Sequence, residues 1–270
     1  MNTPLWINSS LVLDARRAVW LPKEATLAAA DLCLGNPLPA PSAPSRKENV
    51  EPAAAASEEQ MLQAAAEVLG MQENGVHPAS AHETVARLLA LCADYQPKQI
   101  VLMGTLIHPE ADREALIPLL KALFDALRER ATLVLVGDDL DARLDAFLQQ
   151  CDWHAGVVPL WPCGDIALTH SGVAPEALEQ AQEEGKQIIL GFENPAVSLR
   201  RSSAKYPCFV LGAKMVLLPS FSPDLPENDL WESAHIVSVM KRTPFDYTVA
   251  IRKGMLVPAK LGRRVRRSSS

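Results

Sequence analysis

Short apolar runs alternate with segments of helical periodicity between residues 81 and 150. Ile100–Met103 and Leu133–Val136 are continuous apolar runs, each ended by glycine, and both are predicted strands. Apolar side chains recur at helical spacing around Val85–Cys92 and Leu116–Leu127, and again in a shorter segment from residue 144 to 148. Alternating strands and helices predict a mainly parallel sheet in an α/β layered fold.

The pattern on either side of this region is richer in strands. A hairpin is expected from 11–13 and 18–21, followed by a small-residue strand over 25–30. The second half adds one helix, about 175–184, and further strands at 157–161, 166–169, 187–190, 209–211, 215–218, 235–240 and 247–251. The predicted architecture is therefore α/β, with two mixed sheets flanked by helices in one domain over residues 1–251.

Composition changes this picture in two places. Five prolines and many alanines fall between Pro37 and Ala56, so a flexible insertion is expected over about 37–80, with one helix from Ser57 to Leu69 inside it. The last nineteen residues hold seven of the 26 Lys and Arg but no Asp or Glu. Residues 252–270 are expected to form a basic, disordered tail on an acidic body. The formal net charge of the whole chain is −6.

The remaining composition excludes several classes of protein. No apolar run approaches the roughly 20 residues that span a bilayer, and the first residues do not resemble a signal peptide. Five cysteines without a C-x-x-C pair favour reduced thiols in the cytoplasm over a disulfide framework or a zinc ribbon. No glycine-rich nucleotide-binding loop is present.

Polar residues follow several of the predicted strands. Asp31 and Cys33 come after the third strand, Thr105 after Gly104, and His170 after Thr169. The carboxyl ends of strands form the ligand-binding edge of open α/β sheets. Carboxylates and imidazoles at such an edge are the ligands that a two-metal hydrolase requires.

Five segments in this order resemble the DNA-ligase-associated metallophosphoesterases, a bacterial branch of the calcineurin-like superfamily. Residues 30–35 (ADLCLG) are similar to the family's A-D-L-H-L-G, and residues 102–108 (LMGTLIH) to L-x-G-D-L-x-H. Residues 191–195 (GFENP) stand where the family has G-H-x-H-P, while 206–210 and 217–221 resemble its P-C-F and L-P-A-F-G strands. The resemblance covers roughly residues 10–222 and implies a calcineurin-like metallophosphoesterase sandwich.

Most of the family's metal ligands are replaced in this chain. Asp31 and His170 match ligand positions, but Cys33 replaces a histidine and Thr105 replaces the aspartate that bridges the two metals. In the segment equivalent to G-N-H-D, Asp138 and Asp139 stand in place of asparagine and histidine, and Asp141 follows two residues later.

The final motif departs furthest. Phe192 and Asn194 occupy its two histidine positions, and a phenyl ring offers a metal no donor atom. Because even changes around a metal's ligands cost about 10–100-fold in affinity, these replacements together predict that the two-metal centre is lost.

Each of these residues also has a purely structural interpretation. Asp31 could cap a loop through backbone amides, and the Asp138–Asp141 segment could begin a helix, where acidic residues are favoured. His170 and His108 could be hydrogen-bonded polar residues at strand ends. A nucleophilic pair of Cys33 with His170 is conceivable, although inert buried thiols are the commoner case.

The basic tail also allows two interpretations. Arg263, Arg264, Arg266 and Arg267 could contact a nucleic-acid backbone without reading its sequence, or they could belong to a solvated end. No aromatic residue lies among these arginines, so base stacking is not expected there.

Two functions follow as expectations. The first is a degenerate metallophosphoesterase-like protein, non-catalytic or strongly impaired and without a metal cofactor, with a binding or scaffold role beside DNA-processing proteins. The alternative is an active phosphoesterase with a rebuilt site, in which Asp31, Asp138, Asp139 and His170 hold one Mn²⁺ or Mg²⁺.

Overall fold

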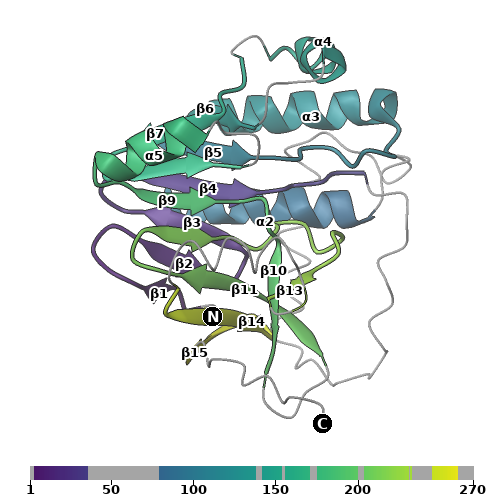
Figure 1. Cartoon of the computed structure of the whole chain (residues 1–270). Helices are drawn as coiled ribbons and strands as arrows, with labels where there is room; N and C mark the ends of the chain where they lie inside the picture. Colours follow the sequence, from purple (N-terminus) through teal and green to yellow (C-terminus); the bar gives the residue numbers. More distant parts are fainter. Residues whose placement is uncertain are drawn as a thin grey trace.

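Two mixed β-sheets pack face to face, with helices on their outer faces (Figure 1). This computed structural model describes residues 3–35, 79–137, 142–153, 156–170, 175–199, 204–230, 232 and 245–260. The predicted fold class is confirmed.

The first sheet contains six strands in the order in which they occur along the chain. They are β1 (Leu5–Trp6), β2 (Val12–Asp14), β3 (Ala18–Leu21), β4 (Thr26–Ala30), β5 (Gln99–Met103) and β6 (Thr132–Val136). The first four pair antiparallel, whereas β4, β5 and β6 are parallel. The carboxyl ends of β4 and β5 therefore lie at one edge of this sheet.

The second sheet contains nine strands. They are β7 (Leu160–Cys163), β8 (Ile166–Thr169), β9 (Gln187–Leu190), β10 (Pro195–Ser198), β11 (Lys205–Leu211), β12 (Met215–Leu217), β13 (Asn228–Asp229), β14 (Tyr247–Arg252) and β15 (Met255–Lys260). Their order is β13-β10-β11-β12-β9-β8-β7, with β14 paired to β11 and β15 to β14. Strands β8, β9 and β12 run parallel, so the ends of β8 and β9 also share one edge.

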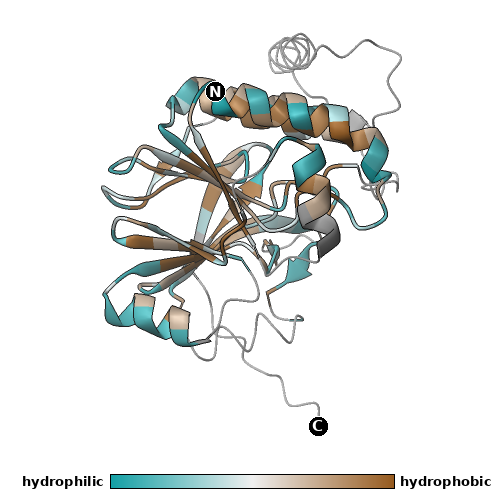
Figure 2. Ribbon diagram, turned by 90° about the horizontal axis from the view of Figure 1, so that it is seen from above, coloured by the Kyte–Doolittle hydropathy of each residue, from teal (hydrophilic) through white to brown (hydrophobic). Residues whose placement is uncertain are grey.

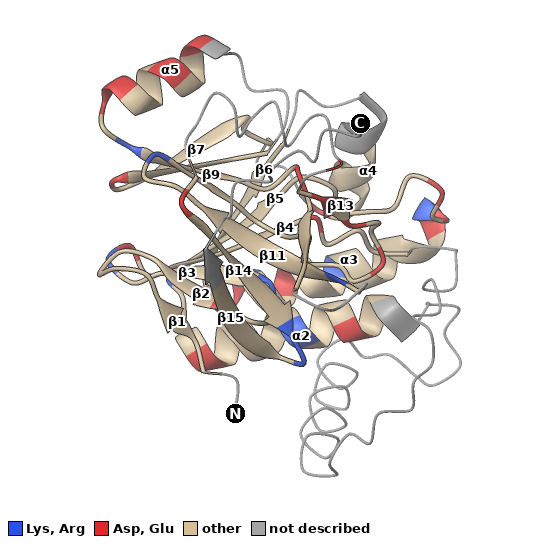
Figure 3. Cartoon of the chain, turned by 60° about the horizontal axis from the view of Figure 1, so that its bottom comes forward, with Lys and Arg blue, Asp and Glu red and all other residues tan. Residues whose placement is uncertain are grey.

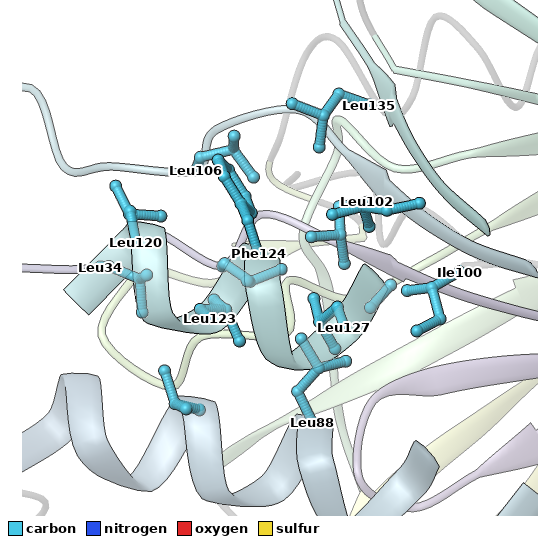
Figure 4. Close-up of a cluster of buried hydrophobic side chains, with 14 of the residues drawn as sticks. Leu34, Leu88, Ile100, Leu102, Leu106, Leu120, Leu123, Phe124, Leu127 and Leu135 are labelled. Atoms are coloured by element: carbon cyan, nitrogen blue, oxygen red, sulfur yellow. The ribbon is translucent and has the colours of Figure 1, made fainter. Parts of the chain in front are cut away.

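Strands with both faces buried explain the continuous apolar runs of the sequence. In β5, Val101 and Met103 face the second sheet, whereas Ile100 and Leu102 face the helices. Helices α2 (Ala79–Tyr95) and α3 (Arg113–Arg128) pack on that outer face, and Figure 4 shows the leucines between them.

The two shorter helices are α4 (Ala142–Gln150) and α5 (Pro175–Glu183). Figure 2 shows α5 on the opposite side of the two sheets from α3, with a largely hydrophilic surface. Ala181 of α5 is buried toward the sheet, while its glutamates are exposed, which gives this helix the acidic surface seen in Figure 3. None of the described helices is long and apolar enough to cross a bilayer.

Several element boundaries differ from the predictions. Helix α2 begins at Ala79, at the end of the predicted 37–80 insertion. The predicted strand 157–161 is shifted to 160–163, and Val158 forms only an isolated bridge to Val136. Strands β1, β10 and β13 were not predicted. The rest of the 37–80 insertion and the expected strand 235–240 lie outside the described residues.

The predicted tail also starts differently. Residues 255–260 are not disordered but form β15, which pairs with β14 along its whole length. Lys253 and Gly254 both have positive φ, as a two-residue type I′ turn requires. The prediction of disorder was wrong because it rested on the basic charge of the segment and overlooked this hairpin.

Candidate functional site

The polar strand ends picked out in the sequence meet where the two sheets share an edge. Asp31 follows β4 and Thr105 follows β5 in the first sheet; His170 follows β8 and Asn194 follows β9 in the second. Parallel pairing within each sheet brings these ends together, as expected for α/β sheets.

A hydrogen bond joins Asp31 to His170. Oδ1 of Asp31 lies 2.9 Å from Nε2 of His170, and the two residues are 4% and 7% exposed. The same Oδ1 accepts the backbone N–H of Thr105 at 2.9 Å. Asp31 therefore caps the loop after β5 by accepting a backbone N–H, as its structural interpretation predicts. The same carboxylate also bonds His170, the second residue that matches a ligand position of the resembling family.

Two glycines make room for this pair. Gly104 has φ of 77°, and a Cβ there would overlap Nε2 of His170 and lie 2.6 Å from Oδ1 of Asp31. A Cβ on Gly191 would lie 2.6 Å from the Cβ of Ala30. Glycine at these strand ends therefore allows the sheets to approach until the two side chains bond directly.

Asn194 has a structural function. Its Oδ1 accepts the N–H of Ser220 at 2.9 Å, and its Nδ2 donates to the carbonyl of Pro226 at 2.8 Å. The residue is 4% exposed and has φ of 41°, a left-handed conformation that asparagine adopts more readily than most residues. Both ends of the amide are used in tying β10 to the loop after β12.

One part of that loop, Pro219–Asp224, holds the backbone of Asp31. The carbonyl of Asp31 accepts the N–H of Ser222 at 3.0 Å and the hydroxyl of Ser220 at 3.1 Å. The N–H of Phe221 donates to the carbonyl of Ala30 at 2.6 Å. Asp31 is therefore fixed at its backbone as well as at its carboxylate.

Two arginine side chains donate hydrogen bonds to backbone carbonyls of this loop. Arg17 donates to the carbonyls of Ser220 and Ser222 at 3.3 and 3.1 Å. Arg87, on α2, donates to the carbonyl of Phe221 at 2.5 Å and stacks over its ring at 4.5 Å. Burial, with Arg17 close by, lowers the pKa of Arg87 to about 10. Sequence reasoning missed both arginines because their partners are backbone carbonyls more than 130 residues away.

Cys33 does not support a nucleophilic role. The side chain is buried, and burial together with the charges of Asp31 and Asp224 raises its pKa to about 12. A thiol with such a pKa stays protonated at neutral pH and is a poor nucleophile. The pairing of Cys33 with His170 is further disfavoured because Nε2 of His170 is bonded to Asp31.

Phe192 lies over the pair at the end of β9. Its ring meets the His170 imidazole edge to face, with 5.4 Å between centroids, and the side chain is 46% exposed. His108 has a local contact instead, since its Nδ1 accepts the N–H of Glu110 at 3.2 Å. Asp138, Asp139 and Asp141, like Arg263, Arg264, Arg266 and Arg267, lie outside the described residues.

The described residues do not fit a two-metal centre. Two neighbouring dications need several carboxylate or imidazole donors and a bridging group, whereas Asn194 is engaged with backbone groups, Phe192 has no donor atom, and Thr105 has only a neutral hydroxyl. Across the part of the chain that the structure describes, no three His, Cys, Asp or Glu side chains group as metal ligands would.

Comparison with known proteins shows the fold. No protein-family model and no curated protein matches the chain. The crystal structure of the Pseudomonas putida nuclease MPE superposes with a TM-score of 0.60 at 17% sequence identity, over 95% of this chain and 99% of that one. The chain therefore shares the fold of that nuclease along nearly its whole length.

Proposed function

We propose that this chain is a degenerate metallophosphoesterase-like protein that has kept the fold but lost most or all hydrolytic activity, and that it works as a binding or scaffold protein. The observation that carries this proposal is the use of the donor atoms at the ligand positions. Oδ1 of Asp31 bonds His170 and Thr105, and both ends of the Asn194 amide bond the chain itself.

Nucleic acid and DNA-processing proteins are the proposed partners, in the bacterial cytoplasm. The resemblance to DNA-ligase-associated proteins and the fold shared with a nuclease both favour this setting. Four arginines between 263 and 267 supply the cationic charge that a phosphate backbone attracts.

Turnover of a chromogenic phosphodiester by the purified full chain tests the loss of catalysis. With Mn²⁺ present, we expect no hydrolysis above the rate of the Asp31→Ala variant. Robust turnover that disappears in Asp31→Ala would overturn the proposal.

Binding to a fluorescent single-stranded oligonucleotide tests the partner. We expect affinity that falls steeply with salt, with a log–log slope of up to about −3 if all four arginines contact phosphates. Replacing Arg263, Arg264, Arg266 and Arg267 with alanine should remove that dependence, whereas replacing the exposed Lys23 should not. Salt-independent binding would contradict a role for the tail.

One observation favours a second candidate, an active phosphoesterase with a single metal. Asp31 and His170 already lie within 2.9 Å of each other, and Asp138 and Asp139 follow the neighbouring strand β6 in sequence. Together these four would hold one Mn²⁺ or Mg²⁺. Calorimetric titration with Mn²⁺ decides the question: micromolar binding that is lost in Asp138→Asn/Asp139→Asn would support this candidate, and absence of binding would remove it.

A further inference from the structure

We propose that the Asp31–His170 hydrogen bond is a metal-free latch that joins the two sheets at their carboxyl edge, with Phe192 as its cover. This inference concerns how the site is held together and goes beyond the proposed function. In a two-metal phosphoesterase, ions bound by both sheets would join them at this edge; here two side chains make the connection directly.

The latch connects parts of the chain that are far apart. Asp31 belongs to the first sheet and His170 to the second, 139 residues later. The apolar cluster between the sheets stabilises their packing, but hydrophobic contacts do not fix the orientation of particular side chains. A hydrogen bond between two buried polar groups adds a directional contact, and it is stronger when one partner is charged.

The geometry leaves Asp31 little freedom to turn elsewhere. Its carbonyl is held by Ser220 and Ser222, and its carboxylate by the Thr105 amide. The space beside the bond is open only because residue 104 is glycine. The carboxylate is therefore oriented toward the imidazole before the bond forms, which lowers the entropy cost of forming it.

The bond excludes metal coordination by the same atoms. The 2.9 Å contact is a hydrogen bond only with a proton between Oδ1 of Asp31 and Nε2 of His170, and a metal ion would compete for the same Nε2 lone pair. A metal ligated by Nε2 would displace that proton and break the latch. Bound metal and latch are therefore alternatives at this site.

Phe192 packs against the imidazole of this pair. The two rings are nearly perpendicular, with 5.4 Å between their centroids, and the Phe192 side chain remains 46% exposed. Histidine stands at this position in the resembling family. Its replacement by a phenyl ring removes a ligand and at the same time lowers the local dielectric, which strengthens a hydrogen bond.

A double-mutant cycle measures the latch. Urea unfolding is compared for the wild type, Asp31→Ala, His170→Ala and the double variant, in EDTA and in millimolar Mn²⁺. We expect the coupling to change the unfolding equilibrium constant about tenfold or more, equally in both buffers. The exposed pair Lys205–Glu232, 3.1 Å apart, is the control, with an expected coupling of about twofold or less.

Two results would overturn the latch. One is that the destabilising effects of Asp31→Ala and His170→Ala simply add up in the double variant. The other is that Mn²⁺ stabilises the wild type and abolishes the coupling between the two residues. Additivity without a Mn²⁺ effect would remove the latch yet leave the proposed function standing, because that function depends on turnover and oligonucleotide binding.

Conservative variants keep the test decisive if the alanine variants do not fold. Asp31→Asn, which retains an acceptor for the Thr105 amide, and Phe192→Ala should each lower the Tm by about 3–8 °C. Met255→Ala, at a similarly exposed apolar residue away from the site, should change it by less than about 2 °C. Equal shifts for Phe192→Ala and Met255→Ala, with none for Asp31→Asn, would contradict the proposal.

Discussion

The side chain of Asn194 accepts the backbone N–H of Ser220 at 2.9 Å, so a residue at a metal-ligand position of the resembling family serves here as a tie between two loops. Ser220 is fully buried, so bulk solvent does not reach its amide. This relationship has a direct consequence for stability.

Asn194→Ala should lower the free energy of unfolding by about 2–4 kcal/mol, because it leaves a buried donor unpaired and places alanine at positive φ. Urea unfolding followed by circular dichroism measures the change. Asn8→Ala is a suitable control, since Asn8 makes a similar bond to the Ser10 amide at an exposed position and should cost less than about 0.5 kcal/mol. Comparable losses for the two variants would show that the Asn194 bonds do not matter.

Gly104→Ala and Gly185→Ala separate steric overlap from backbone strain. The two glycines have nearly the same φ, 77° and 78°, but a Cβ would overlap His170 at Gly104 and meets nothing within 4 Å at Gly185. Gly185→Ala should cost about 1–2 kcal/mol, the strain of a left-handed alanine. Gly104→Ala should cost at least about 2 kcal/mol more, or prevent soluble expression. Equal thermal shifts would mean that the Asp31–His170 pair moves aside freely.

Stability should fall as the pH rises above about 9. Burial raises the pKa of Cys33 and Cys92 to about 12 and that of Cys151 to about 11. Between an unfolded pKa near 9 and these folded values, the folded state holds protons that the unfolded state has released, so increasing pH favours unfolding. Thermal melts from pH 7 to 10.5 should show a decline that begins near pH 9.

The same cysteines should resist alkylation. At pH 8.5 the native protein should react with iodoacetamide far more slowly than the urea-unfolded chain, with the site assigned by mass spectrometry. Rapid modification of native Cys33 would contradict its burial and reopen a nucleophilic role.

Proline protects two outer strands of the second sheet. Strand β7 precedes a two-residue turn and β15 follows one. The registers place Pro162 one pair, and Pro258 three pairs, beyond the hydrogen-bonded pair at its turn, so both prolines lie at non-hydrogen-bonded pairs. At such positions the backbone nitrogen faces away from the paired strand. Proline removes the donor that a second molecule would need to add a strand.

Pro258→Val should therefore promote association through β15. Light scattering at increasing concentration should detect oligomers in this variant but not in the parent chain or in Val257→Thr, whose backbone groups face β14. A monodisperse Pro258→Val protein with unchanged stability would show that something else protects this edge.

Most strands could be predicted from the sequence because both of their faces are buried. Residues 100–103 and 133–136 are apolar throughout, and such runs show themselves without knowledge of the partner strand. Strands β1, β10 and β13 have two to four residues with half-exposed patterns. These strands form because a neighbouring strand supplies hydrogen-bond partners, and the local hydrophobic pattern of a segment does not identify its neighbour.

The residue types alone determined which metal donors the chain lacks, since no arrangement makes Phe192 a ligand or Thr105 a carboxylate. Only the tertiary structure decided what the remaining donors do. Asp31 and His170, or Asn194 and Ser220, become partners because two sheets pack with the ends of their parallel strands at one edge. Such contacts depend on packing between segments up to 139 residues apart, whereas a sequence pattern reports only the neighbours within a few residues.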